Sequence, residues 1–275
     1  MTIPLPGPFW LIGCGNMAGA MLRRWLACGM DPARVTVVRP SGAPVAEGVR
    51  VLTALPEDEV PAVVMLGFKP QKLDEVAPAL APALEAETVL ISILAGVELS
   101  SLRRRFAAPR AIVRAMPNLP VELGKGVVNL YSDVEGETRE FPTALMAALG
   151  HAEWFEEEPL FQAAGVLSGA GPAFLFRFID ALAKAAEALG LPPEQAMRLS
   201  LAMVEGGGAW AAAAGESPAR LAQRVASPGG TTEAGLKVLD QDGALERLVA
   251  ETLANARRRS NEMAAQARDG ARGLG

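Results

Sequence analysis

The chain has 275 residues, of which 50% are hydrophobic and 21% are charged, and its formal net charge is −5. This length exceeds that of a typical single domain, and so apolar a composition excludes a largely disordered protein. The negative charge argues against a nucleic-acid-binding protein, since such proteins usually present a basic face.

The cysteine content and the N-terminus indicate the cellular compartment. Cys14 and Cys28 are too few for a disulfide framework or a metal cluster, so we expect no metal site and a reducing, cytoplasmic environment. The first residues lack a basic segment followed by an apolar run, as a signal peptide would have. There is also no uninterrupted apolar run of about 18 residues. We therefore expect a soluble protein without a membrane partner.

The first part of the chain alternates short β-branched runs with amphipathic stretches. This alternation predicts a parallel sheet covered by helices, which is an α/β fold. The predicted strands are 9–13, 35–38, 62–68, 88–94, 111–115 and 127–131. The predicted helices between them are 17–28, 73–84, 99–106 and 137–149.

The strand pattern ends near residue 160, and alanine-rich helical segments follow. The predicted helices are 172–189, 193–214, 218–225, 236–240 and 244–268. Several of them begin with proline, which is favoured in the first helical turn. A run of glutamates precedes this half, so we predict an α/β domain at 1–156 and an all-α domain at 157–275.

A glycine-rich turn follows the first predicted strand, in the segment FWLIGCGNMAGAML. Gly13, Gly15 and Ala18 match the G-x-G-x-x-A fingerprint of a dinucleotide-binding turn of the Rossmann type. Gly13 permits the tight turn, Gly15 lets a pyrophosphate approach the backbone, and Ala18 lets helix and strand pack closely. The helix start, at Asn16 and Met17, offers N–H groups to phosphates. An ordinary strand–helix turn that happens to contain glycines is the alternative.

The end of the second predicted strand distinguishes NADPH from NADH. An NAD site usually has Asp or Glu there for the ribose 2′-hydroxyl, whereas this chain has Arg39 and Ser41. A guanidinium forms charge-assisted hydrogen bonds with a 2′-phosphate. The sequence therefore favours NADPH, although NADH stays possible and Arg39 could simply be an exposed loop residue.

The run ASPGGTTEAG at 226–235 interrupts the helical half. It cannot continue a helix, and so many small, turn-forming and hydroxyl-bearing residues favour a loop that binds a small ligand. A simple helix–helix turn with a threonine cap is the alternative.

Six motifs in this order resemble the pyrroline-5-carboxylate reductase family over nearly the whole chain. They are GCGNMA at 13–18, GFKPQ at 67–71, ISILAGV at 91–97, RAMPNLP at 114–120, LSGAGPAF at 167–174 and SPGGTT at 227–232. The resemblance implies a Rossmann-type N-terminal domain and an all-α C-terminal domain that forms an intertwined homodimer, with possible higher assembly of dimers. It also implies reduction of L-Δ1-pyrroline-5-carboxylate to L-proline, the last step of proline biosynthesis, with NADPH or NADH.

The resemblance implies that the loop at 227–232 binds the substrate carboxylate and that Thr232, as the catalytic residue, hydrogen-bonds the imine nitrogen. The implied substrate-binding residues are Ser227, Gly229, Gly230, Thr231 and Thr232. We expect the N–H groups of the two glycines to converge on one pair of oxygens, and a helix to begin near Thr232.

The remaining motifs are expected around the cofactor. The resemblance implies that Pro70 and the backbone at Ala95 and Gly96 border the ribose and nicotinamide, and the segment 116–120, which contains Asn118, is expected on the nicotinamide side. Lys69 is expected to bind the cofactor as well. A solvated or phosphate-side role suits Lys69 better than that of a general acid. SGAGPAF is expected to open a long helix whose start is set by Gly171 and Pro172, and which helps to build the dimer and the active site.

Hydride transfer to an imine needs mainly alignment and exclusion of water, so we expect little acid–base catalysis. His151 and Tyr131 lie outside the motifs and are expected to be structural. The chain departs from the family pattern at Leu119, Ala170, Phe174 and Arg224; the first three lack a hydroxyl that is usual there, and Arg224 either reaches a phosphate or is exposed.

Two other functions stay open. One is another reductase of the β-hydroxyacid dehydrogenase type, which would use a lysine of the helical domain as its acid; the candidates are Lys184 and Lys237. The other is a non-catalytic NADPH-binding sensor, which would bind the cofactor without turning over any cyclic imine.

Overall fold

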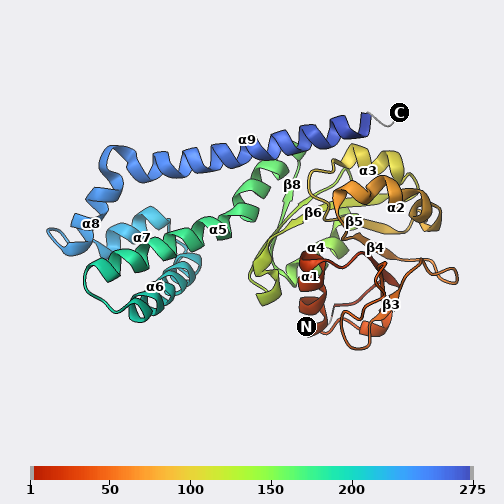
Figure 1. Ribbon diagram of the computed structural model, residues 1–275, viewed down its shortest axis with the longest axis horizontal. Coiled ribbons are helices and arrows are strands. Elements are labelled where there is room, and N and C mark those ends of the chain that lie inside the picture. The colour runs from red at the N-terminus through yellow and green to blue at the C-terminus, as the bar shows by residue number, and fades with distance from the viewer. Residues whose placement is uncertain (1–2, 273–275) are drawn as a thin grey trace. The chain divides into compact units, whose positions relative to one another are not determined.

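The computed structural model describes residues 3–272, and in the last helix it describes side chains only up to residue 262. The chain divides into two compact units (Figure 1). The first contains the residues up to 169 together with the last helix from residue 257 onwards, and the second contains residues 170–256. The ends of the predicted domains, at 1–2 and 273–275, lie outside the described residues.

The first unit is built on one sheet of eight strands. They are β1 (Phe9–Ile12), β2 (Val35–Val38), β3 (Arg50–Leu52), β4 (Val63–Leu66), β5 (Val89–Ser92), β6 (Ala111–Pro117), β7 (Gly126–Tyr131) and β8 (Gly150–Phe155). Their order across the sheet is β3-β2-β1-β4-β5-β6-β7-β8. Neighbouring strands are parallel except for β6 and β7, which are antiparallel. The order β3-β2-β1-β4-β5-β6 is that of a Rossmann fold, as predicted, and it places the ligand-binding switch point at the carboxyl ends of β1 and β4.

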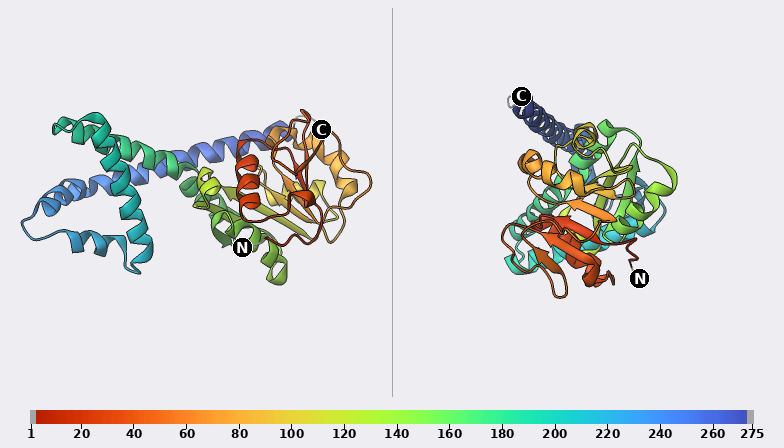
Figure 2. Two further views of the ribbon diagram at one scale, coloured as in Figure 1. Left: turned by 90° about the horizontal axis from the view of Figure 1, so that it is seen from below. Right: turned by 90° about the vertical axis from the view of Figure 1, so that its right-hand side faces the viewer.

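Helices cover both faces of this sheet (Figures 1 and 2). They are α1 (Asn16–Ala27), α2 (Leu73–Leu80), α3 (Leu99–Arg105) and α4 (Glu140–Ala147). Side chains alternate between two hydrophobic clusters along β1: Phe9 and Leu11 enter one, and Trp10 and Ile12 enter the other. A strand that is buried on both faces has a continuous run of apolar residues, which explains why β1 was predicted from the sequence.

All six predicted strands are confirmed, and two strands were missed. β3 has only three residues and is half-exposed at the edge of the sheet. β8 carries the polar side chains of His151 and Glu153 on its exposed positions. Short or half-exposed edge strands lack the continuous apolar run that identified the central strands.

Helix α5 (Glu158–Ala188) corrects the prediction that a helix starts at Pro172, because Pro172 lies inside it. Proline has no N–H for the carbonyl four residues earlier, which is that of Ser168. Asn118 donates its Nδ2 to the Ser168 carbonyl oxygen over 2.9 Å. A side chain from outside the helix therefore replaces the missing donor, and the helix continues through the proline.

The second unit is helical, as predicted. It contains the later part of α5, α6 (Pro193–Ala213), α7 (Pro218–Val225), α8 (Thr231–Asp240) and the first part of α9 (Ala244–Arg272). The boundaries predicted for α6 and α7 are confirmed to within one residue. The predicted helix start at 236 is wrong, because α8 begins five residues earlier with Gly230 as its N-cap, and the expectation that a helix begins near Thr232 is confirmed.

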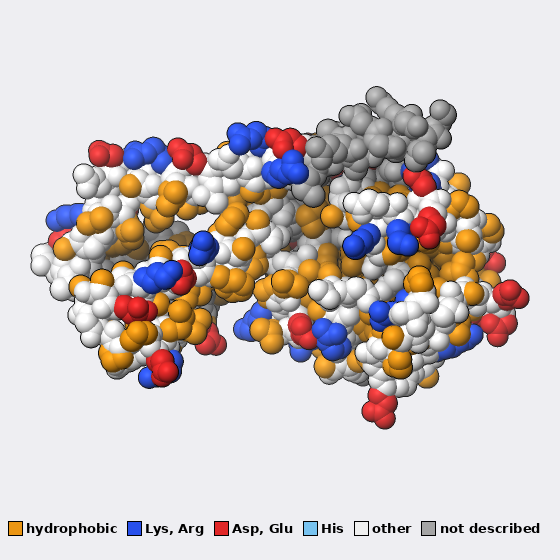
Figure 3. Space-filling model, in the orientation of Figure 1, with side chains coloured by type: hydrophobic (Ala, Val, Ile, Leu, Met, Phe, Trp, Pro, Cys, Tyr) orange, Lys and Arg blue, Asp and Glu red, His pale blue; other side chains and the backbone are white. Residues whose placement is uncertain are grey.

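Large hydrophobic side chains are exposed over this second unit (Figure 3). They include Phe176, Phe178, Leu189, Leu199, Leu201, Met203 and Val238. Among the described helices, α5 has the length and composition that a membrane span needs, and only 11% of its most apolar window is buried. The expectation of no such segment, which rested on uninterrupted apolar runs, did not anticipate this helix. A surface of this kind is usually covered by a partner.

Candidate active site

The glycine-rich turn has the geometry that the fingerprint predicted. Gly13 has φ +78, and a Cβ there would lie 2.9 Å from the Cβ of Phe68. Gly15 is the N-cap of α1, no side chain among the described residues caps that helix, and a Cβ at Gly15 would meet nothing within 4 Å. Ala18 is buried, and a Cβ added at Gly67 would lie 2.9 Å from the Cβ of Ala18. The first N–H groups of α1 therefore face open space at the switch point of the sheet.

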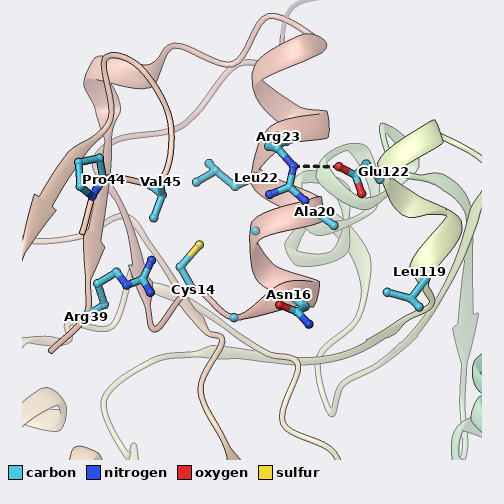
Figure 4. Close-up of a pocket in the computed structure, with 12 residues that line it drawn as sticks. Cys14, Asn16, Ala20, Leu22, Arg23, Arg39, Pro44, Val45, Leu119 and Glu122 are labelled. Atoms are coloured by element: carbon cyan, nitrogen blue, oxygen red, sulfur yellow. Dashed lines mark hydrogen bonds and ion pairs between the residues drawn. The ribbon is translucent and has the colours of Figure 1, made fainter. Parts of the chain in front are cut away.

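A cavity of about 580 Å³ lies beside this turn (Figure 4). Three of the predicted cofactor residues, Gly15, Asn16 and Arg39, line it. Ser41 does not line it; its hydroxyl accepts a hydrogen bond from the N–H of Ala43 over 3.4 Å. An uncapped helix start and a guanidinium in one cavity can hold two separate phosphate groups.

Several residues that line this cavity were not predicted from the sequence. They are Cys14, Gly19, Ala20, Leu22, Arg23, Pro44, Val45 and Glu122, and Leu119 was expected only as a departure from the family pattern. Burial raises the pKa of the Cys14 thiol, while the charges of Arg39 and Arg23 oppose that rise. Arg23 donates its Nε to Glu122 Oε1 over 2.9 Å. In the sequence, Arg23 and Glu122 look like ordinary charged residues on the exposed face of a helix. Nothing in the sequence therefore marked them as cavity residues.

A second cavity, of about 240 Å³, lies at the carboxyl ends of β5 and β6. Met17 and Ala95, both predicted cofactor residues, line it together with Met116 and Pro117. Gly96, Lys69 and Pro70 line neither cavity. Gly96 has φ +75, and Lys69 precedes a single 3-10 turn that starts at Pro70.

A buried arginine lines the second cavity. The side chain of Arg114 is 4% exposed, and its NH1 lies 2.5 Å from Glu158 Oε1. Burial lowers the pKa of Arg114, and the Glu158 carboxylate opposes this shift. The guanidinium lies 4.6 Å from the centre of the Phe161 ring. Glu158 also accepts the N–H of Leu99 over 2.8 Å, so β6, α3 and α5 are held together at this cavity.

The side-chain amide of Asn118 forms hydrogen bonds through both its oxygen and its nitrogen. Its Oδ1 accepts the N–H of Val127 over 2.9 Å, and its Nδ2 donates to Ser168. Asn118 is buried and lines neither cavity. The hydrogen bonds of this side chain therefore hold β7 and α5 in place.

The loop at 227–230 is a tight turn that leads into α8. Gly229 has φ +70, which favours glycine. The N–H of Gly230 donates to the Ser227 carbonyl over 2.9 Å, and the N–H of Gly229 donates to Glu233 Oε2 over 2.7 Å. Both N–H groups that we expected to converge on a substrate carboxylate thus have partners within the protein, one in the loop and one in the first turn of α8.

The hydroxyl-bearing residues of this loop are exposed. They are Ser227, Thr231 and Thr232, and both threonines lie in the first turn of α8. No side chain among the described residues caps the start of α8. Arg224, at the end of α7, pairs with Glu216 and lies 5.5 Å from the centre of the Trp210 ring.

The residues that other functions would need lie in ordinary surface environments. Lys184 pairs with Asp180 over 2.8 Å, and Lys237 pairs with Glu233 over 3.3 Å, each within its own exposed helix face. His151 is exposed on β8, 2.8 Å from Glu153, which agrees with the predicted structural role. Tyr131 lies in β7 with its ring 6.0 Å from that of Phe161.

Comparison with known proteins gives full-length relatives. Residues 158–263 match the family described as pyrroline-5-carboxylate reductase dimerisation, and residues 9–96 match the family described as NADP oxidoreductase coenzyme F420-dependent. The chain is 37% identical to pyrroline-5-carboxylate reductase of Pseudomonas aeruginosa, over 93% of this chain and 96% of the relative. It is 32% identical to the enzyme of the same name from Escherichia coli K12, over 84% of this chain and 89% of the relative.

Solved structures agree with these relatives. A pyrroline-5-carboxylate reductase from Coxiella burnetii superposes with a TM-score of 0.87 at 32% identity, covering 94% of this chain and 98% of that one. The Plasmodium falciparum pyrroline carboxylate reductase with NADP bound superposes with a TM-score of 0.79 over 94% of this chain and 98% of that one. At 22% identity, this second likeness shows the fold alone.

Proposed function

This chain belongs to the pyrroline-5-carboxylate reductase family, and we propose that it reduces L-Δ1-pyrroline-5-carboxylate to L-proline with NADPH as the hydride donor. The observation that carries this proposal is the 37% identity to a reductase of that name over 93% of the chain. The reaction makes the chain an oxidoreductase of proline biosynthesis.

The residues around the first cavity fit the cofactor. The uncapped start of α1 and the open space at Gly15 suit a pyrophosphate, and Arg39 suits a 2′-phosphate better than a free 2′-hydroxyl. When bound, NADPH supplies a hydride from C4 of its nicotinamide. We assign the pyrophosphate to Gly13, Gly15, Asn16, Met17 and Ala18, the 2′-phosphate to Arg39 and Ser41, a phosphate-side contact to Lys69, and the ribose and nicotinamide to Pro70, Ala95, Gly96 and Asn118.

The role of Asn118 in this assignment is limited by its hydrogen bonds. Because one N–H and the Oδ1 of its amide bond to the protein and the residue lines neither cavity, we expect its contact with the cofactor to come from its backbone. NADH stays a possible donor, since a single arginine disfavours it without excluding it.

The loop of Ser227, Gly229, Gly230, Thr231 and Thr232 binds the substrate in this proposal. The two glycines shape the turn, since their N–H groups bond Ser227 and Glu233. The exposed first turn of α8 then offers the N–H groups and hydroxyls of Thr231 and Thr232 to a carboxylate. The Thr232 hydroxyl donates a hydrogen bond to the imine nitrogen.

The side chains orient the reactants and add little acid–base chemistry. An imine that is hydrogen-bonded at nitrogen is electrophilic at carbon, so alignment and exclusion of water account for most of the rate. Thr232 keeps its proton and only polarises the imine, and the ring nitrogen takes its proton from solvent, so that one hydride and one proton are added across the C=N bond. Loss of Thr232 should therefore slow the reaction without stopping it.

The observed lysines disfavour a β-hydroxyacid dehydrogenase reaction. Lys184 and Lys237, the candidate acids, are both held in exposed ion pairs on their own helices. The remaining alternative, a sensor without catalysis, predicts NADPH binding without turnover.

The chain forms a homodimer, because residues 158–263 are a dimerisation domain of this family. Burial of α5 in the dimer explains its exposed apolar residues without a membrane. We propose that the domains divide after residue 156, which the start of the family match at 158 supports. We also propose that the enzyme is soluble and cytoplasmic, and that dimers can assemble further.

The test is the oxidation of NADPH by purified protein with L-Δ1-pyrroline-5-carboxylate, with NADH in parallel and proline measured at the end. NADPH oxidation that is matched by proline formation supports the proposal. Tight NADPH binding without oxidation would favour the sensor instead.

A further inference from the structure

Two guanidinium groups line the cofactor cavity, although the sequence pointed to only one of them. Among the described residues that line it, Arg23 and Arg39 are the cationic ones and Glu122 is the acidic one. Arg39 follows β2, whereas Arg23 lies on α1. In Figure 4 the side chain of Cys14 lies between the two groups.

Arg23 folds back along α1 toward the glycine-rich turn. A Cβ at Gly19 would lie 3.3 Å from Arg23 NH1 and 3.8 Å from Cys14 Sγ. Gly19 precedes Arg23 by one helical turn, and long side chains on a helix point toward its N-terminus. The absence of a side chain at Gly19 therefore leaves the room that the guanidinium occupies.

Glu122 fixes the other edge of this guanidinium. The ion pair uses Nε of Arg23, 2.9 Å from Glu122 Oε1, whereas NH1 is the atom that lies over Gly19. A guanidinium that is held through Nε still presents NH1 and NH2 to a second acceptor. The charges of Arg23 and Arg39 both reach Cys14, where they oppose the rise in its pKa that burial causes.

The position of Arg23 suits a 2′-phosphate better than the pyrophosphate. The uncapped N–H groups at the start of α1 receive a pyrophosphate in a Rossmann turn, and Arg23 lies beyond that first turn. A phosphate monoester is nearly a dianion at neutral pH and binds strongly where two guanidinium groups converge.

We propose that Arg23 is a second specificity-determining residue for NADPH, and that its guanidinium, held by Glu122 and accommodated by Gly19, binds the 2′-phosphate together with Arg39. This inference rests on the proposed cofactor. The alternative is that Arg23 only braces α1 against the 3-10 helix η4 (Leu119–Leu123) through Glu122.

The test measures binding of two fragments by isothermal titration calorimetry, with the full-length protein and without turnover. Adenosine 2′,5′-bisphosphate carries the 2′-phosphate, and 5′-AMP lacks it. The variants are Arg23→Gln, Arg23→Lys and Arg39→Gln. The matched control is Arg104→Gln, which removes the same charge from an exposed residue of α3 outside the cavity.

We expect Arg23→Gln to weaken binding of the bisphosphate about tenfold, or about 1.4 kcal/mol, and to change 5′-AMP binding less than twofold. Arg23→Lys should recover part of the loss because it keeps the charge, and Arg104→Gln should change neither affinity. In the reductase assay, the kcat/KM for NADPH divided by the kcat/KM for NADH should fall in parallel for Arg23→Gln.

Equal effects of Arg23→Gln on both fragments, or no effect on either, would overturn the role of Arg23. If only Arg39→Gln removed the preference for the bisphosphate, the proposed cofactor would stand and this inference would fail. If the unmodified protein bound both fragments equally, the preference for NADPH would fail as well.

Discussion

Asn118 Nδ2 donates a hydrogen bond to the carbonyl oxygen of Ser168, which is the carbonyl that Pro172 leaves without a helical donor. The contact explains how α5 runs from Glu158 to Ala188 without ending at a proline. It also gives Asn118, in the motif RAMPNLP, a structural role. A buried carbonyl without a donor costs free energy comparable to that of a lost hydrogen bond.

Asn118→Ala should therefore lower the free energy of unfolding by about 1–3 kcal/mol, measured by urea denaturation. The matched background is Pro172→Ala, in which residue 172 regains an N–H for the Ser168 carbonyl. The loss from Asn118→Ala should be smaller by about 1 kcal/mol in that background. Equal losses in both backgrounds would show that Asn118 does not compensate for the proline.

The ion pair between the buried Arg114 and the partly exposed Glu158 predicts a larger effect on stability. Glu158→Gln leaves the Arg114 charge buried without its counter-charge and should destabilise the protein by about 3–5 kcal/mol. Glu156→Gln, at the exposed end of the Arg139 pair, is the control and should cost much less. Similar denaturation midpoints for the two variants would contradict this account of Arg114.

The hydrogen bond from the Gly229 N–H to Glu233 predicts a kinetic effect at the loop that we propose binds the substrate. Glu233→Ala removes the acceptor that holds this turn, so the KM for pyrroline-5-carboxylate should rise about fivefold, while the KM for NADPH stays unchanged. Glu233→Gln keeps an acceptor oxygen and should restore most of the affinity. Lys237→Ala is the control for the loss of the Glu233–Lys237 ion pair. A rise in KM with Lys237→Ala as large as that with Glu233→Ala would instead assign the effect to the ion pair.

Thr232 is predicted to assist the reaction by donating one hydrogen bond to the imine nitrogen. Thr232→Ala should lower kcat about tenfold without abolishing activity, and Thr232→Ser should retain most of it because it keeps the hydroxyl. Steady-state kinetics with both substrates would measure this. An unchanged kcat in Thr232→Ala would remove Thr232 from the mechanism.

The parts of the fold with strong local patterns were predictable from the sequence. β1 and β4 are apolar on both faces, and Gly13 and Gly15 lie between a strand and a helix, so their pairing and turn could be anticipated. β8 was not predicted because two of its six residues are exposed and none is fully buried. The predicted α5 was too short because the donor that compensates for Pro172 lies 50 residues earlier in the chain.

Parts of the candidate site could be predicted where a short sequence motif is typical of one kind of ligand. Gly15, Asn16 and Arg39, which the motif and the strand end singled out, line one cavity, and their binding of the cofactor stays a prediction. Arg23, Glu122 and the Arg114–Glu158 pair were not recognised, because only folding brings their partners together. The N–H groups of Gly229 and Gly230 were assigned to the substrate, yet the chain itself supplies their acceptors.

The measurement that tests the central claim most directly is hydride transfer from NADPH labelled with deuterium at the transferred position of C4. With L-Δ1-pyrroline-5-carboxylate, the account predicts proline that is one mass unit heavier, formed in proportion to the NADPH oxidised. Oxidation of labelled NADPH without labelled proline, or no oxidation despite cofactor binding, would contradict it.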